Sequence, residues 1–192
     1  MPDRRRGKRT LLVLAALFVA PVLASYLAYY YLGPQGRTNY GTLVDPQRPT
    51  ATLALVDATA RPTSFGAFAG RWVMVAVDEG RCEATCVEQL TLMRQLRLAT
   101  GKDRDRIERV LLVTGNSLPA PDVLAPFAGT VVLRASVEAL QALLPVAAGA
   151  SVADHLYLVD PLGNLMMRYP KSPDGSRIRK DLERLLRVSR IG

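Results

Sequence analysis

The sequence of 192 residues predicts a single α/β domain that follows one membrane-spanning helix. Two observations lead to this fold class. Residues 10–32 form an almost uncharged apolar run, which is about the length needed to cross a bilayer. The rest of the chain alternates between short apolar strands and amphipathic helices, which is the order of a sheet flanked by helices.

The apolar run predicts an uncleaved anchor in a bacterial inner membrane. Residues 1–9 before it hold five basic residues and one acid, and such flanks stay in the cytoplasm. We therefore expect a cytoplasmic tail at residues 1–9 and a periplasmic location for everything after Leu32. An interfacial aromatic belt is indicated at the far end of the run by Tyr26, Tyr29, Tyr30 and Tyr31. A cleaved signal peptide, cut within residues 20–25, is the alternative, but the run is longer than a usual signal core.

The formal charge of +8 is concentrated at the two ends of the chain. Residues 1–9 contribute +4, and residues 168–192 hold eight basic and three acidic residues. A periplasmic location argues against nucleic-acid binding. We interpret the basic C-terminal segment as a solvated helix face, with attraction to anionic lipid headgroups or to an acidic partner as the second interpretation.

The segment of residues 33–50 is rich in Gly, Pro and polar residues and predicts a linker. Residues 51–192 are then one domain. We predict strands at residues 51–56, 72–77, 107–114, 130–133, 155–159 and 165–169. We predict helices at residues 86–100, 121–127, 136–144 and 177–188, on the basis of their apolar spacing, their caps and the glycine after the first of them.

The order of these elements is strand, helix, strand, helix, then a β-hairpin and a last helix. This is the order of a thioredoxin-like fold, in which a central mixed sheet is flanked by helices. The position of the two cysteines, directly after the first buried strand, supports the same fold.

Cys82 and Cys86 are the only cysteines and lie where the buried strand 72–77 turns into a helix. Unpaired N–H groups at a helix start favour the thiolate, and a spacing of four puts both sulfurs on one face of the first turn. A Cα separation of about 6 Å would permit a disulfide. The pair can therefore act as a redox pair, or hold a soft ion such as Cu(I) through two thiolates. A plain structural disulfide is the alternative.

His155 is the only histidine, at the start of the strand 155–159 that runs beside the cysteine-bearing loop in this topology. A neutral imidazole there would complete a copper site with Cys82 and Cys86. The alternative is a half-buried histidine that forms a local hydrogen bond near Asp154.

Taken together, these motifs resemble the Sco/SenC family, over roughly residues 51–188. The similar segments are residues 54–86 with the CxxxC motif, residues 119–124 with their prolines, and Asp154-His155 followed by residues 157–163. Counting back from Pro161, the copper histidine of the family falls at Val152. Either a short deletion lets His155 reach the site, or His155 is not a ligand.

The resemblance implies a membrane-anchored factor that carries copper, as Cu(I) or Cu(II), to the dinuclear copper site of cytochrome c oxidase. Its partner would be a respiratory oxidase subunit or another copper protein. It would be an assembly factor rather than an enzyme. Two alternatives remain, namely a periplasmic thiol–disulfide oxidoreductase that uses Cys82 and Cys86, and a non-catalytic assembly scaffold with a structural disulfide.

Overall fold

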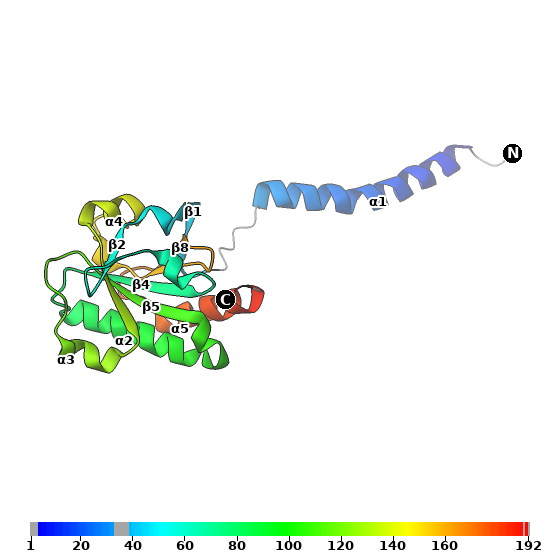
Figure 1. Cartoon of the computed structure of the whole chain (residues 1–192). Coiled ribbons are helices and arrows are strands. Elements are labelled where there is room, and N and C mark those ends of the chain that lie inside the picture. The colour runs from blue at the N-terminus through cyan, green and yellow to red at the C-terminus, as the bar shows by residue number, and fades with distance from the viewer. Residues whose placement is uncertain (1–3, 33–38, 190, 192) are drawn as a thin grey trace. The chain divides into compact units, whose positions relative to one another are not determined.

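The computed structural model describes residues 4–32, 39–189 and 191, and the chain divides into two compact units, residues 1–38 and 39–192. The described part of the first unit is one helix, α1 (Arg4–Leu32). By length and composition, the Gly7–Tyr31 stretch of this helix (Figure 1) is a candidate membrane span. The side chains of residues 7–31 are exposed. Part of the predicted basic tail belongs to this helix, since α1 begins at Arg4, while residues 1–3 lie outside the described residues.

The second unit is built on a mixed sheet of eight strands in the order β1-β8-β7-β4-β5-β6-β2-β3. Strands β4, β5 and β6 run parallel, whereas the other neighbouring pairs are antiparallel. The strands are β1 (Thr42–Pro49), β2 (Leu55–Asp57), β3 (Pro62–Thr63), β4 (Trp72–Asp78), β5 (Ile107–Val113), β6 (Thr130–Arg134), β7 (Tyr157–Val159) and β8 (Asn164–Arg168). This arrangement confirms the predicted α/β class with a central mixed sheet.

Helices cover both faces of this sheet (Figure 1). The α-helices are α2 (Ala84–Ala99), α3 (Pro121–Leu124), α4 (Val137–Leu143) and α5 (Gly175–Val188). Short 3-10 turns connect them at η1 (Thr50–Thr52), η2 (Phe65–Phe68), η3 (Gly101–Arg106), η4 (Ala125–Phe127) and η5 (Val152–Asp154). One core cluster lies between the sheet and α2 and α5, and a second lies between the opposite face and α4 and η2. Residues 39–192 thus hold a complete sheet and both of its cores.

The predicted central strand at residues 72–77 is confirmed as β4. All its residues from Trp72 to Val77 are buried, because alternate side chains enter the two clusters on opposite faces. A strand buried on both faces needs the continuous apolar run seen in the sequence. The predicted helix at residues 136–144 also forms, as α4, and the Ser136 side chain accepts a hydrogen bond from the Ala139 N–H.

The sheet contains one strand that was not predicted, β1, which lies within the expected linker 33–50. It pairs antiparallel with β8 at the edge of the sheet. Only Val44 in this strand is buried, so there is no apolar alternation to indicate a strand. Residues 33–38 of the expected linker lie outside the described residues. The predicted strand 51–56 forms only in part, since η1 occupies its first half and β2 its second.

The start of the second unit is fixed to α5. The buried Asp181 carboxylate accepts hydrogen bonds from the N–H groups of Tyr40 and Gly41, at 2.9 Å each. The Arg177 guanidinium lies 4.2 Å from the centre of the Tyr40 ring, and the Tyr40 hydroxyl accepts a bond from the Asp174 N–H. The chain therefore joins the domain beside this helix.

Candidate redox and metal site

The segment between β4 and α2 is folded around the Asp78 carboxylate. This carboxylate accepts hydrogen bonds from the N–H groups of Gly80, at 2.6 Å, and of Cys82, at 2.9 Å. An aspartate that bonds the backbone two and four residues further on holds a tight turn in place. The turn brings the chain from the carboxyl end of the central strand directly to the start of α2.

Cys82 and Cys86 form a disulfide across this turn, with a Cα separation of 4.9 Å. Cys86 lies in the first turn of α2, whereas Cys82 precedes the helix and has a left-handed backbone conformation with φ of 50°. The sulfurs therefore meet because of the turn, and not because both residues lie on one face of the helix as the sequence predicted. Both cysteines are almost fully buried, at 3% and 4% exposure, within the core cluster beneath α2 and α5.

A second loop, residues 114–118, packs backbone against backbone on the cysteine turn. A Cβ atom on Gly80 would lie 2.1 Å from the Ser117 carbonyl oxygen, and one on Gly115 would lie 1.8 Å from the Glu79 carbonyl oxygen. The Thr114 N–H also donates a 3.0 Å hydrogen bond to the Asp78 carbonyl. Both glycines are thus required by the close approach of the loops.

The residues that shape the site were missed by sequence reasoning, which singled out only the cysteines and the histidine. The signal for the turn was present, since an aspartate followed two residues later by a glycine is common where the chain turns tightly. Nothing in the sequence indicated that Gly115 would meet the cysteine turn, because that contact depends on how β4 and β5 pair.

His155 is buried, at 1% exposure, and both ring nitrogens bond the backbone. Nδ1 lies 2.9 Å from the Tyr169 carbonyl oxygen, and Nε2 lies 3.1 Å from the Ala147 nitrogen, whose N–H it accepts. This arrangement requires a neutral ring that donates through Nδ1. Burial lowers the pKa of His155, and the positive charge of Arg168 lowers it further, while the bond to Tyr169 opposes the shift.

The structure places His155 on the opposite face of the sheet from the cysteines. Leu156 and Leu158 belong to the core cluster that contains Cys82 and Cys86, whereas Tyr157 belongs to the other cluster. Because side chains alternate along an extended chain, His155 falls on the Tyr157 side, and the two ring centroids are 6.0 Å apart. The structure thus brings the two cysteines together and leaves His155 away from them.

Among the described residues, the two cysteines belong to no larger group of His, Asp and Glu side chains that could bind a metal. Within residues 4–32, 39–189 and 191, there is no group of three or more His, Cys, Asp and Glu side chains that could hold a metal ion. Val152, at the expected position of the family's copper histidine, lies in η5 and packs against the cluster of the opposite face. The reduced site therefore offers two thiolates, which suit a soft ion such as Cu(I).

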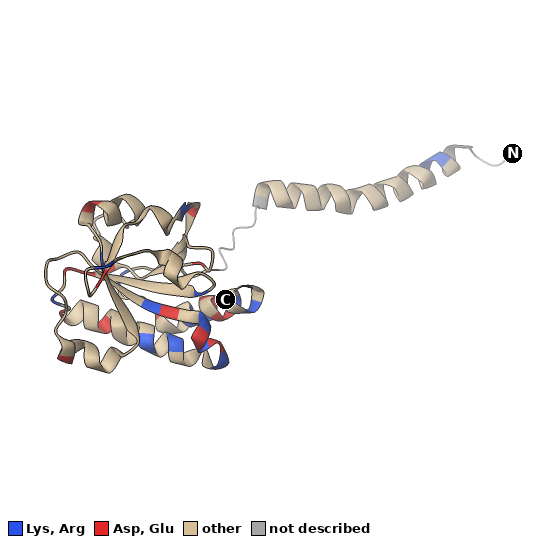
Figure 2. Cartoon of the chain, viewed as in Figure 1, with Lys and Arg blue, Asp and Glu red and all other residues tan. Residues whose placement is uncertain are grey.

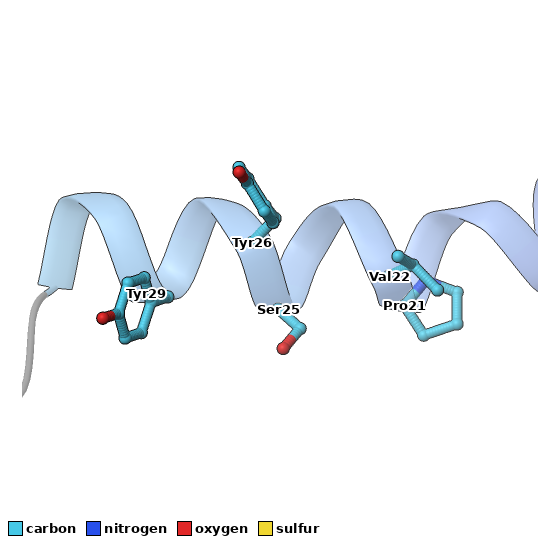
Figure 3. Close-up of a pocket in the computed structure, with 5 residues that line it drawn as sticks. All are labelled: Pro21, Val22, Ser25, Tyr26 and Tyr29. Atoms are coloured by element: carbon cyan, nitrogen blue, oxygen red, sulfur yellow. The ribbon is translucent and has the colours of Figure 1, made fainter.

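Two surface hollows lie away from the cysteines. One, of about 340 Å³, is lined by His155, Arg168, Lys171 and the loop 147–150. The other, of about 560 Å³, is lined by a single stretch of α1. In that stretch, Tyr26 and Tyr29 point to different sides of the helix, and Ser25 points to the same side as Tyr29 (Figure 3). Neither hollow contains a group that would act on a disulfide.

Comparison with known proteins supports the thioredoxin-like fold. Residues 72–189, more than half of the chain, match the family described as transmembrane-like, thioredoxin-like, C-terminal domain. A comparison with curated proteins gives no significant match.

Solved structures of Sco proteins share the fold at low sequence identity. BsSco, described as a member of the Sco family of cytochrome c oxidase assembly proteins, is 13% identical with a TM-score of 0.56, covering 77% of this chain and 99% of that one. Apo Sco1 from Thermus thermophilus is 19% identical with a TM-score of 0.57, covering 77% and 96%. Yeast Sco1 with copper bound is 15% identical with a TM-score of 0.56, covering 80% and 96%.

These structures confirm, at the level of fold, the resemblance found in the sequence. The family match begins at Trp72, the first residue of β4, and continues through α5, so it includes the cysteine turn and both flanking loops. The chain belongs to the transmembrane-like, thioredoxin-like family.

Proposed function

We propose that this protein is a membrane-anchored, Sco-like factor that takes part in assembling the copper site of cytochrome c oxidase, with its folded domain in the periplasm. The observation that carries the proposal is the Cys82–Cys86 pair at the start of α2, directly after the central strand β4. Support comes from the fold shared with copper-bound yeast Sco1 and with BsSco. The client would be an oxidase subunit or another protein that receives copper.

The proposed chemistry is a two-electron switch at the cysteine pair. A dithiol reductant transfers two electrons and two protons to the disulfide, which yields two thiols, and the reductant leaves as a disulfide. Cu(I) then binds the two sulfurs as thiolates, which releases both protons. Copper is thus the cargo of the protein. His155 takes no part, because its two ring nitrogens are engaged by Tyr169 and Ala147.

Burial of the cysteines sets a condition on this chemistry. Thiol–disulfide exchange needs direct access to a sulfur atom, and both residues are at most 4% exposed. The turn between Asp78 and Ala84 must therefore open for the reductant and for copper. Such an opening breaks no side-chain cap at the start of α2, because the N-cap residue Glu83 forms no side-chain hydrogen bond with the helix.

The test is a Cu(I) titration of the reduced full-length chain in detergent, in competition with a chromophoric chelator. We expect one Cu(I) per chain, and we expect the Cys82→Ser/Cys86→Ser variant to lose this binding. The His155→Gln variant is the matched control and should bind as tightly as the wild type. Equal affinity of the wild type and the double serine variant would contradict the proposal.

A second candidate function is a non-catalytic assembly scaffold with a structural disulfide. The observation that favours it is the position of both cysteines inside the core cluster. It predicts that the double serine variant is less stable but still supports oxidase assembly in cells. If that variant folds and oxidase activity is lost, the scaffold function is excluded.

A further inference from the structure

The positive charge of the domain is concentrated at one end, where α2 and α5 terminate. Residues 97–106 and 179–188 hold eight basic and four acidic side chains. The rest of residues 39–192 holds eleven basic and twelve acidic side chains, so it is close to neutral. Figure 2 shows basic residues gathered around the ends of α2 and α5. We call the surface formed by these two segments the basic end.

The two segments of the basic end are joined in space. The Arg106 guanidinium donates to the carbonyl oxygens of Leu186 and Ser189, at 3.0 Å each, so η3 is fixed to the last turn of α5. A hollow of about 390 Å³ is lined by side chains of both segments, among them Lys102 and Arg187. The charges of η3 and α5 therefore form one continuous surface.

Each acidic side chain of the basic end already forms an ion pair or accepts backbone hydrogen bonds. Asp103 pairs with Arg106, Asp105 pairs with Arg97 and Arg104, and Glu183 pairs with Arg179. The fourth acid, Asp181, is buried and accepts the amides at the start of the domain.

Among the residues that the structure describes, Lys102, Lys180 and Arg187 have no acidic partner. Lys180 and Arg187 are seven residues apart on α5, so they lie on the same outward side of the helix. These three residues give the basic end an unneutralised positive charge that faces solvent.

Apolar side chains are exposed beside these charges. Leu98 at the end of α2 is 55% exposed, Val188 at the end of α5 is 77% exposed, and Ile191 is 51% exposed. Cations mixed with exposed aliphatic side chains at the end of a helix are typical of a surface that rests on a bilayer, with the aliphatic groups among the headgroups.

The covalent chain limits how far the start of the domain can lie from the end of α1. Leu32 and Asn39 are seven residues apart, which limits their separation to about 25 Å. The chain then joins the domain at Tyr40 and Gly41, which are bonded to Asp181 on α5, the helix that carries half of the basic end.

We propose that the basic end docks on the anionic headgroups of the bilayer in which α1 is anchored. This inference rests on the membrane anchoring proposed above and is independent of copper and of the redox chemistry. A lipid surface fits better than an acidic protein, because the short covalent connection to α1 limits the distance between the domain and the proposed bilayer. The basic end also combines cations with exposed aliphatic side chains. Each basic residue near an anionic bilayer contributes about fivefold to binding.

Docking also sets the orientation of the cysteine pair. Cys86 is in the first turn of α2, and the basic end begins at Arg97 in the last turn of this helix, so a rise of about 17 Å along the helix separates them. The cysteine end then points away from the bilayer, toward the part of a client that extends from the membrane.

The test measures co-sedimentation of residues 39–192, which hold the complete sheet and both cores, with lipid vesicles. We compare phosphatidylcholine vesicles with and without about 30 mol% phosphatidylglycerol. We expect binding to the anionic vesicles at about 0.05 M NaCl and release at about 0.5 M. The Lys102→Gln/Lys180→Gln/Arg187→Gln variant should bind about 100-fold more weakly.

The matched control removes the same charge elsewhere, as Arg61→Gln/Arg81→Gln/Lys171→Gln, from side chains that are 77%, 78% and 67% exposed. This control should bind like the wild type. In nanodiscs that hold the full chain, phosphatidylglycerol should slow hydrogen exchange of residues 98–106 and 180–188. Equal binding to neutral and anionic vesicles, or equal weakening in both triple variants, would overturn the proposal and leave the Cu(I) titration untouched.

Discussion

The two cysteines and His155 are all buried, but their polar and reactive atoms are held in opposite ways. The disulfide lies under α2, in a turn held by the Asp78 carboxylate and by close backbone contact with a second loop. His155 lies on the other face of the sheet, with both ring nitrogens bonded to carbonyl and amide groups. The turn can change its covalent state, whereas the histidine is a structural group. Two segments at neighbouring strands of a sheet therefore need not contribute to one site, because their side chains can face opposite sides of the sheet.

The largest effect is expected from filling the contact beneath the cysteine turn. Gly80→Ala places a Cβ atom 2.1 Å from the Ser117 carbonyl oxygen, at a residue with φ of 113°. Overpacking and left-handed strain together should lower the free energy of unfolding by about 4 kcal/mol in a chemical denaturation experiment.

Gly70→Ala is the matched control for this substitution. Gly70 also has a positive φ, of 82°, but no atom lies within 4 Å of the Cβ position. Its cost should be about 1 kcal/mol, from backbone strain alone. Similar losses for the two variants would show that the contact between the loops is not a constraint on the cysteine turn.

Replacing His155 is expected to have a smaller effect on stability and no effect on Cu(I) binding. His155→Ala removes a buried ring and leaves the Tyr169 carbonyl and the Ala147 N–H without their partner. We expect the free energy of unfolding to fall by about 3 kcal/mol. The Cu(I) affinity of the reduced chain, measured below the unfolding transition, should not change. A weaker affinity would show that the ring reaches the thiolates after all.

The smallest effect is a pH dependence that also belongs to the histidine. Burial holds the pKa of His155 below its usual 6.5, so the unfolded chain takes up a proton at a higher pH than the folded chain does. The stabilisation is complete above pH 6.5 and is lost as the pH falls below that value. The loss between pH 6.5 and 5.5 is at most about 1 kcal/mol, which is the limit for one histidine that stays neutral in the folded chain.

The sequence makes this pH effect easy to assign. His155 is the only histidine in the chain, and carboxylates mostly titrate at lower pH. His155→Gln should therefore remove the slope of stability between pH 6.5 and 5.5. A slope that persists in this variant would identify another group as its source.

Most of the fold could be predicted because its central elements carry strong signals. Strand β4 is apolar on both faces, and the start of α4 is indicated by its N-cap residue, Ser136. Strand β1 gave no such signal, since a single buried valine in an edge strand produces no pattern. Its position depends on pairing with β8, a contact between residues about 120 apart in the chain.

The candidate site was predictable in its residues but not in its geometry. The spacing of Cys82 and Cys86 predicted that their sulfurs could meet, and they do. His155 was correctly predicted next to the start of its strand. The face of the sheet on which its side chain lies depends on the register of the strand, because a shift of one residue moves every side chain to the other face. Composition does not determine this register.

The contact between the two glycine-containing loops links the cysteines to a segment that has no sulfur. Because the Glu79 and Ser117 carbonyls occupy the space where side chains would lie on Gly115 and Gly80, the two loops are in direct backbone contact. The Thr114 N–H also donates to the Asp78 carbonyl, so a movement of the disulfide turn would change the surroundings of residues 114–118. Asn116 and Ser117 are exposed in that segment, so under the proposed function a change at the buried cysteines would reach the protein surface there.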